Sequence, residues 1–305
     1  MVVTVSVGIC AYNEEKQISG LVESLIDQTV AKGSELKEIL VVASGCTDGT
    51  EKIVEKWTQI EPRIRLIREP ERKGKVSALN LILDQYRGDI LVLMNADARL
   101  RPKAVEQILV PFLQDERVEI ACGRPIPETS KGGPKKLLTE FQWSIHNRTL
   151  ETLSRLGLDN HCCDEFMAIR RGFVTTLPSD LINDGAYLGV LAALKRRSVR
   201  FCPNAEVVVE VQGNLLGVLR YRRRGIWAHR QVESLLDRPS STFRLVAKRR
   251  PQLAAKILAE EFSDRPLSAL VFVFLALPLE LMANFLAIID FLRRKPYQAA
   301  WPVVE

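Results

Sequence analysis

Several sequence signatures of common nucleotide- and nucleic-acid-binding proteins are absent from the 305-residue chain. No G-x-x-x-x-G-K-[ST] motif occurs, which argues against a P-loop NTPase. No G-x-G-x-x-G motif follows the first β-rich segment, at 2–10, and this disfavours a dinucleotide-binding Rossmann domain. Helix-turn-helix, zinc-finger and RNP-like motifs are missing as well, so we expect no nucleic-acid partner.

Cysteines with metal-binding spacing are also absent. The six cysteines include no C-x-x-C pair, and several lie in apolar runs. This argues against a zinc site or a disulfide framework and indicates reduced thiols in the cytosol. Because no basic stretch precedes the short apolar segment at 2–10, we expect no signal peptide. Hydrophobic residues make up 47% and charged residues 26% of the chain, a balance that predicts a folded protein.

Strand-like and helix-like segments alternate in the front of the chain. The expected strands are 2–10, 38–42, 64–67, 89–94 and 118–123, with helical patterns between them. This alternation predicts βαβ units and an α/β fold with a Rossmann-like, mainly parallel central sheet. Further on, the proline- and glycine-rich segment 125–134 predicts a loop, and two strands are expected at 199–202 and 205–211.

The run from Asp89 to Asp97 places a carboxylate at the end of a buried strand. Open α/β sheets bind their ligands at the carboxyl ends of such strands. Asp97 can therefore bind a hard cation that bridges the phosphates of a substrate. It can equally cap the helix that begins near Pro102. This stretch alone leaves both interpretations open.

Polar clusters follow two other predicted strands, at Asn13-Glu14 and at Ser44 to Asp48. Parallel strands end at one edge of a sheet, so these clusters should lie near Asn95 to Asp97. The basic segment 72–75 precedes a helix, where free N–H groups and cations suit phosphate. Together the four clusters predict a nucleotide-phosphate site.

These clusters resemble the nucleotide-binding half of the family 2 inverting glycosyltransferases, which have the glycosyltransferase A fold. The matching motifs are 11–15, 44–50 and 73–80, and Asn95 to Asp97 stands where the family has D-x-D. The resemblance implies a nucleoside diphosphate sugar as donor and a divalent Mn²⁺ or Mg²⁺. It also implies the following roles: Asn13 and Glu14 against the nucleoside, Asp48 near the base and ribose, Lys75 near the base or diphosphate, and Asp97 with Asn95 on the metal.

Two departures from the family pattern lie in the same region. The family usually has an acidic pair where this chain has Ala43-Ser44, so recognition of the base must depend on Asp48 and Glu14. Asn95 replaces the first acid of D-x-D, and an amide oxygen still accepts but carries no charge.

Two further acidic stretches match the family more loosely. Asp184 resembles the aspartate that begins a helix in the family's E-D motif, and Asn183 replaces the usual glutamate. Transfer with inversion needs a carboxylate that takes the proton of the acceptor hydroxyl, so the resemblance implies Asp184 as general base. Capping of the helix is the other interpretation. Asp164 and Glu165 precede a strand like the one beneath the family's sugar pocket and would touch the donor sugar or the acceptor, unless they are ordinary strand-start acids.

The last third of the chain is basic and then apolar. Between Arg220 and Arg250 there are ten Lys or Arg and two acids, which suits an anionic lipid surface. A partial match to the Q-x-x-R-W motif of polysaccharide synthases implies that Arg224 contacts the diphosphate and Trp227 the acceptor. A basic, membrane-facing helix is an equally good interpretation.

Residues 267–289 are long enough to cross a membrane, which takes ~20 apolar residues. Pro278 and the charged Glu280 weaken a simple span. A kinked transmembrane helix, an in-plane or re-entrant anchor, and a helix buried in an oligomer remain open. Because the donor is cytosolic, we favour association with the cytoplasmic face of the membrane without a full crossing.

The predicted organisation has three parts: a nucleotide-sugar-binding half at 1–125, the acceptor-side half of the same catalytic domain at 126–238, and a basic and hydrophobic helical membrane-associating region at 239–305, through which the chain could oligomerise. The predicted activity is metal-dependent transfer of a sugar, with inversion, to a hydroxyl acceptor such as a lipid-linked saccharide or a polysaccharide. The alternative is a membrane protein that binds nucleotide sugars and has lost catalysis.

Overall fold

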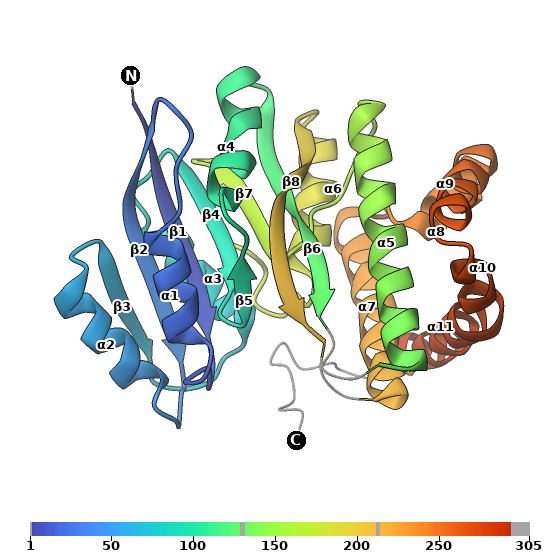
Figure 1. The fold of residues 1–305 in the computed structure, drawn as a ribbon, viewed down its shortest axis with the longest axis horizontal. Helices are drawn as coiled ribbons and strands as arrows, with labels where there is room; N and C mark the ends of the chain where they lie inside the picture. The colour runs from blue at the N-terminus through green and yellow to red at the C-terminus, as the bar shows by residue number, and fades with distance from the viewer. Residues whose placement is uncertain (1, 129–131, 212–213, 294–305) are drawn as a thin grey trace.

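A single eight-stranded sheet forms the centre of the computed structural model, which describes residues 2–128, 132–211 and 214–293 (Figure 1). The strand order is β3-β2-β1-β4-β7-β6-β8-β5. Pairing is parallel for β1–β2, β1–β4, β2–β3 and β6–β8 and antiparallel for β4–β7, β6–β7 and β5–β8. The strands are β1 (Val3–Ala11), β2 (Ser34–Ser44), β3 (Ile64–Glu69), β4 (Ile90–Asn95), β5 (Ala98–Leu100), β6 (Val118–Glu128), β7 (Phe166–Arg170) and β8 (Ser198–Glu210). The predicted α/β class and Rossmann-like sheet are confirmed.

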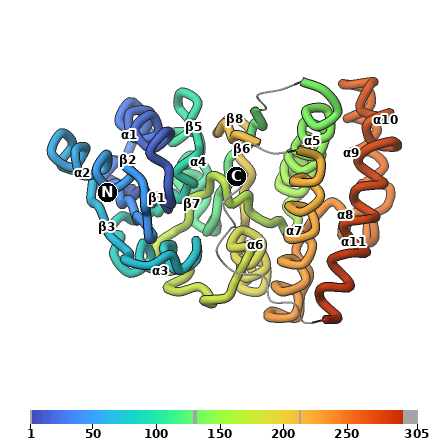
Figure 2. The backbone as a smooth tube through the Cα atoms, turned by 90° about the horizontal axis from the view of Figure 1, so that it is seen from below, coloured from blue at the N-terminus to red at the C-terminus, as the bar shows by residue number. Residues whose placement is uncertain are grey.

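Helices cover both faces of the sheet, because the central strands are apolar on both sides (Figure 2). On one face, Leu21 of α1 and Ile108 of α4 pack with Val7 and Val92 in one buried cluster. The other face is covered by α3 and α6, and also contacts α7. The helices of these two layers are α1 (Ile18–Ile26), α2 (Thr50–Ile60), α3 (Lys75–Gln85), α4 (Ala104–Gln114) and α6 (Asp184–Leu194).

The strand register brings the predicted polar clusters to one edge of the sheet. Ala11 pairs with Ala43 on β2, and Cys10 pairs with Asn95 on β4, so β1, β2 and β4 end side by side. β7 runs the other way, and its first residue, Phe166, pairs with Met94. The acids just before Phe166 therefore lie at this carboxyl edge as well.

The loop predicted at 125–134 is wrong over its first four residues. β6 continues to Glu128 and pairs there with β8, from Arg124 opposite Glu206 to Glu128 opposite Glu210. Pro125 and Pro127 are tolerated because β7 pairs only with 120–122, which leaves their other side without a ladder partner. Residues 129–131 of the predicted loop lie outside the described residues. β8 is one strand, whereas two were predicted, and the short strand β5 was not predicted.

The remaining helices form a layer beside the sheet, at the right of Figure 1. They are α5 (Pro134–Arg155), α7 (Leu215–Leu236), α8 (Phe243–Arg249), α9 (Pro251–Asp264), α10 (Leu267–Val271), the π-helical turn Phe272–Ala276, and α11 (Leu277–Leu292). Within the described ranges, Leu267–Leu292 is the one helical stretch long and apolar enough to cross a membrane, and only 17% of its most apolar window is buried.

The polar side chains of α11 face the protein, and its apolar side chains face outward. Glu280 accepts two hydrogen bonds from Arg222 of α7, at 3.0 and 3.1 Å, and Asp290 forms an ion pair with Arg223. Along α10, the π-helical turn and α11, the outward face consists of large apolar side chains that are more than half exposed: Leu267, Leu270, Val273, Phe274, Leu281, Met282, Phe285 and Leu292. The charge of Glu280 argued against a simple transmembrane span in the sequence, and the structure pairs it with Arg222 of α7.

Candidate active site

Asn13 and Asp48 tie together the loops that follow β1 and β2. The side chain of Asn13 accepts a hydrogen bond from the Thr47 N–H (2.8 Å) and donates one to the Thr47 hydroxyl (3.1 Å). Asp48 accepts from the hydroxyl and N–H of Thr50, at 2.6 and 3.0 Å, and from the Glu15 N–H at 3.1 Å. Burial opposes the charge of Asp48, but these hydrogen bonds outweigh it and lower its pKa. Both predicted nucleoside residues therefore also fix the shape of this edge.

Three carboxylates approach one another at the same edge. Burial, followed by repulsion from Asp97 and Asp48, raises the pKa of Glu14 to about 7. Asp97 lies in the turn between β4 and β5 with its side chain exposed. It does not cap α4, because the N-cap of that helix is Lys103 and no side-chain cap bond is present. The helix-capping interpretation of Asp97 is therefore wrong.

The donor set at this edge fits a metal that is shared with a substrate. In the described ranges, no three His, Cys, Asp or Glu side chains come close enough to cage a metal by themselves. Asn95, the last residue of β4, and Asp97, two residues later in the turn, instead offer two hard oxygen donors, with Glu14 nearby. Mg²⁺ commonly binds through one or two carboxylates, substrate phosphates and water, and Asp97 and Asn95 fit that arrangement.

A buried acid that the sequence reasoning missed lies beneath Ser44. Glu69, the last residue of β3, accepts hydrogen bonds from the hydroxyls of Ser44 and Ser77 and is 5% exposed. An acid is thus one hydrogen bond away from the position where the family usually has an acidic residue. The pairing of Ser44 with Glu69 in the β2–β3 register is what brings them together. Nearby, the Arg72 guanidinium stacks on the Tyr12 ring at 3.7 Å.

Lys75 joins the two acidic stretches of the second half of the chain. It is the first residue of α3, and its Nζ lies 3.1 Å from Asp164 Oδ2 and 3.3 Å from Asp184 Oδ1. The side chain of Asp184 is 1% exposed, and neither of its oxygens has a well-formed hydrogen bond to a described residue. Burial raises the pKa of Asp184 to about 6, while Lys75 acts in the opposite direction. Asp184 is therefore mostly ionised at neutral pH and still basic enough to accept a proton.

The cap of α6 is Asn183 and not Asp184. The Asn183 side chain accepts a hydrogen bond from the Ala186 N–H at 2.7 Å, which is the usual N-cap contact. Asp184 is the first residue inside the helix, so its carboxylate is not used for capping. Asn183, which stands where the family usually has glutamate, serves as this cap.

Glu165 and the start of α7 complete this second cluster. Burial, and then the charge of Asp164, raises the pKa of Glu165 to about 8, and Cys163 Sγ donates to its Oε2 at 2.8 Å. Glu165 is therefore largely protonated at neutral pH. Tyr221 on α7, which is 46% exposed, lies within range of the charges of Glu165 and Asp164. Tyr221 lies close to both acids, although no sequence motif pointed to it.

The structure places the two predicted residues of α7 differently. Arg224 is 5% exposed within the helix layer. The Trp227 ring packs against Phe291 of α11, with ring centroids 6.5 Å apart. Trp227 therefore lies at the contact between α7 and α11, and the substrate contacts of both residues stay predictions.

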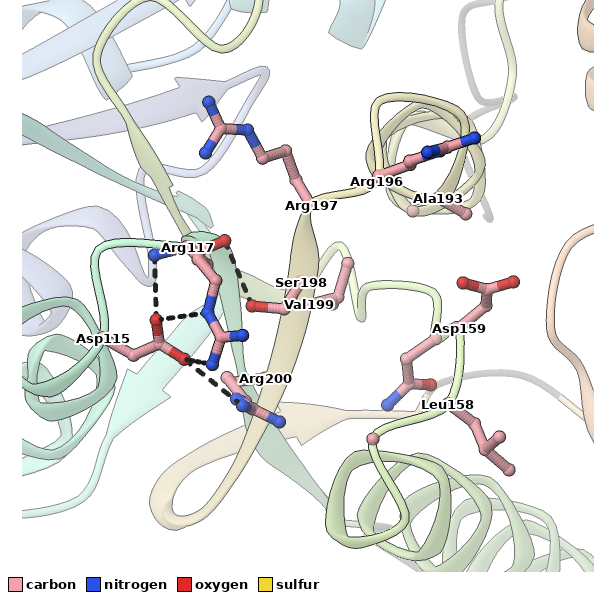
Figure 3. Close-up of a pocket in the computed structure, with 13 residues that line it drawn as sticks. Asp115, Arg117, Leu158, Asp159, Ala193, Arg196, Arg197, Ser198, Val199 and Arg200 are labelled. Atoms are coloured by element: carbon pink, nitrogen blue, oxygen red, sulfur yellow. Dashed lines mark hydrogen bonds and ion pairs between the residues drawn. The ribbon is translucent and has the colours of Figure 1, made fainter.

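A cavity of about 440 Å³ lies outside these clusters; Figure 3 shows the residues that line it. It opens at the amino ends of β6 and β8, beside Arg117 and Ser198, at the opposite edge of the sheet. Two of its four arginines share one acid: Asp115 pairs with Arg117 at 3.1 Å and with Arg200 at 3.6 Å. The candidate active site is the carboxyl edge, where the acids and Lys75 converge.

Comparison with known proteins gives one family. A sequence model described as "Glycosyl transferase family 2" matches residues 6–177, more than half of the chain. An uncharacterized glycosyltransferase of Haemophilus influenzae is 32% identical over 114 residues, which are 37% of this chain and 34% of that protein. Chondroitin synthase of Escherichia coli is 31% identical over 144 residues, 47% of this chain and 20% of the synthase. The matches thus span about a third or less of these curated relatives.

Solved structures share the fold. The mannosyltransferase PcManGT of Pyrobaculum calidifontis, solved with GDP-Man and Mn²⁺, superposes with a TM-score of 0.64 at 22% identity, over 95% of this chain and 87% of that one. Glucosyl-3-phosphoglycerate synthase of Mycobacterium tuberculosis, solved with UDP, gives a TM-score of 0.52 at 21% identity, over 78% and 82% of the two chains.

Proposed function

Because the chain belongs to glycosyl transferase family 2, we propose that it transfers a sugar from a nucleoside diphosphate sugar to a hydroxyl acceptor, with inversion at the anomeric carbon. The observation that carries this proposal is the presence of two acidic clusters, Glu14–Asp48–Asp97 and Asp164–Glu165–Asp184, at one sheet edge with Lys75 between them. The first cluster suits a divalent cation that a donor diphosphate would share, and the second contains an ionisable carboxylate held away from water.

The donor side would hold the nucleoside diphosphate and a divalent Mn²⁺ or Mg²⁺. Asp97 and Asn95 would hold that metal together with the diphosphate oxygens. A bound metal neutralises the charge that develops on the departing diphosphate. Solved relatives of this fold were determined with Mn²⁺, and this supports the choice of metal.

Asp184 acts as the general base on the acceptor side. The acceptor oxygen attacks the anomeric carbon, the bond from that carbon to the phosphate oxygen breaks, and the hydroxyl proton passes to the carboxylate of Asp184. An acceptor hydroxyl would also supply the hydrogen bond that the two buried oxygens of Asp184 lack. The pKa of about 6 keeps the carboxylate ionised at pH 7, as a base requires.

We further propose that α10 and α11 lie in the plane of a membrane, at its cytoplasmic face, beside a lipid-linked or other surface-bound acceptor. The stretch Leu267–Leu292 would be roughly 39 Å long as a continuous helix, enough for a bilayer core of roughly 30 Å. However, ion pairs to Arg222 and Arg223 hold α11 along α7. A full crossing would take these arginines into the bilayer, at a cost of roughly 2.5 kcal/mol or more each.

An in-plane position also agrees with the surrounding charges. Arg244, Lys248, Arg249 and Arg250, at or just after α8, are all exposed. Apolar side chains on one face and basic residues nearby are typical of helices that lie at the surface of anionic membranes.

A panel of nucleotide sugars tests the enzymatic proposal. We expect the wild type to release a nucleoside diphosphate in the presence of Mn²⁺ and a hydroxyl acceptor, and Asp184→Asn to lose turnover by about 10²-fold or more while it still binds the donor. Asp97→Ala should abolish the metal-dependent part of the activity. Donor binding by the wild type without turnover on any acceptor would instead identify a binding protein that has lost catalysis, and release of pyrophosphate would identify a nucleotidyltransferase.

A further inference from the structure

The ammonium group of Lys75 is surrounded by acidic and carbonyl oxygens of the acceptor side. Its Nζ donates to the carboxylate of Asp164 at 3.1 Å and to the backbone carbonyl of Asp164 at 3.2 Å, and it lies 3.3 Å from Asp184. Two of the three ammonium protons are donated to Asp164, and the contact with Asp184 Oδ1 is an ion pair. The side chain is 19% exposed. In this arrangement the hydrogen bonds and ion pairs of the Lys75 ammonium are with Asp164 and Asp184, on the acceptor side.

The backbone fixes where Lys75 begins. Gly74, the N-cap of α3, has φ +98°, a left-handed conformation that favours glycine. Val76, the next residue, is 2% exposed in the cluster beneath α6. The backbone on both sides of Lys75 is therefore fixed, and this fixes the direction in which its side chain leaves the start of α3.

The groups that face Asp184 come from three neighbouring segments. Lys75 on α3 favours the ionised carboxylate, and Asp164, before β7, disfavours it. Burial raises the pKa of two nearby thiols, Cys10 on β1 and Cys162 before Asp164, and the charge of Asp184 raises it further. Glu165, which interacts with Asp164 and Lys75, adds a further acid to the cluster. Lys75 is thus the cation that balances a group of buried or half-buried acids.

We propose that Lys75 is a positioning residue for the general base: its ammonium keeps the Asp184 carboxylate ionised and held in place for the acceptor hydroxyl, and it is not a ligand of the donor diphosphate. This inference rests on the proposed function. The physical reason is that a carboxylate removed from water reverts to its neutral acid unless an opposite charge lies within a few ångströms. A neutral Asp184 cannot accept a proton.

The test measures transfer kinetics from pH 5.5 to 9.5 for the full chain and three variants: Lys75→Met, Lys75→Arg and Lys56→Met. The last variant removes an exposed lysine on α2 as the matched control. For Lys75→Met we expect kcat at pH 7 to fall on the order of 10²-fold, with the donor KM changed less than about threefold. The midpoint of the acid limb of kcat should move upward, so that activity recovers as the pH is raised. Lys75→Arg should keep the wild-type midpoint, and Lys56→Met should match the wild type throughout.

A rise of about tenfold or more in donor KM, with an unmoved acid limb, would overturn the inference and assign Lys75 to the diphosphate. That result would leave the proposed function intact, whereas a wild type without turnover would remove the function itself. If Lys75→Met fails to fold, as judged by thermal melting, the same profile is measured on Lys75→Gln. Its amide keeps the hydrogen bonds but not the charge, and an acid limb at the wild-type midpoint would again refute the role.

Discussion

Replacement of Asp184 by asparagine should stabilise the protein while it removes activity. The folded protein holds Asp184 with a pKa of about 6, whereas the ordinary value is 3.8. A tenfold change in proton affinity is worth about 1.4 kcal/mol, so the ionised carboxylate costs the folded state about 3 kcal/mol. The side chain is 1% exposed, so solvent screening reduces this little. The neutral asparagine amide would resemble the protonated acid and would not carry that cost.

The effect has a defined dependence on pH. Because the folded pKa is raised, the carboxyl group favours folding fully only below its unfolded pKa, and this contribution is lost as the pH rises through about 6. The stabilisation by Asp184→Asn should therefore be about 3 kcal/mol at pH 8 and only about 1 kcal/mol at pH 4.5. For a chain of this size these values correspond to gains in melting temperature of roughly 6 °C and 2 °C.

Thermal melting of the two proteins between pH 4.5 and 8 measures this difference directly. Asp84→Asn, which changes an exposed acid on α3, serves as the control and should show no pH-dependent gain. A variant that is less stable than the wild type at pH 8, or a gain that does not grow with pH, would show that Asp184 is not a strained, desolvated carboxylate.

Two further predictions concern the membrane face and the donor edge. The wild type should float with anionic lipid vesicles, and the double variant Leu281→Glu with Phe285→Glu should not, because both side chains lie on the outward face of α11. The control variant Leu113→Glu, which changes an exposed apolar position on α4, should still float. Equal flotation of all three proteins would contradict the in-plane model. Gly45→Ala should destabilise the protein by about 2 kcal/mol or more and weaken donor binding, because Gly45 has φ +61° and an added Cβ would lie 2.4 Å from the Arg72 nitrogen. Gly20→Ala, where nothing lies within 4 Å, should leave donor binding unchanged in calorimetry, and a similar loss in both variants would refute this reasoning.

The strands that carry the site were predictable because they are buried on both faces and read as continuous apolar runs. The run before Asp97 indicated both β4 and its carboxyl edge, and the register of β1 with β2 and β4 confirms that the polar clusters meet. The end of β6 was not predictable in this way. Proline signals a loop in sequence, but whether a strand tolerates it depends on which side lacks a partner, and the β6–β7 pairing decides that.

Long-range contacts set the part of the site that sequence reasoning missed. The link from Lys75 to Asp164 and Asp184 joins residues about a hundred positions apart, and no local spacing encodes it. Glu69 was overlooked because a lone acid at a strand end has no motif, yet the register with Ser44 places it beneath the donor edge. Similarly, Glu280 looked like a charge inside an apolar helix until its partner on α7 was seen.

The antiparallel pairing of β4 with β7 has a mechanical consequence. Asp97 follows β4 and Asp164 precedes β7, and these two strands are hydrogen-bonded neighbours in one sheet, with Met94 opposite Phe166. The two sides of the site are therefore parts of one sheet and not separate lobes about a hinge, so substrates cannot enter by a hinge opening of the sheet. We therefore expect closure over bound substrates to come from loops and helix ends, while the sheet holds the ends of β4 and β7 together. The register of β4 with β7 thus sets the distance between the donor side and the acceptor side of the site.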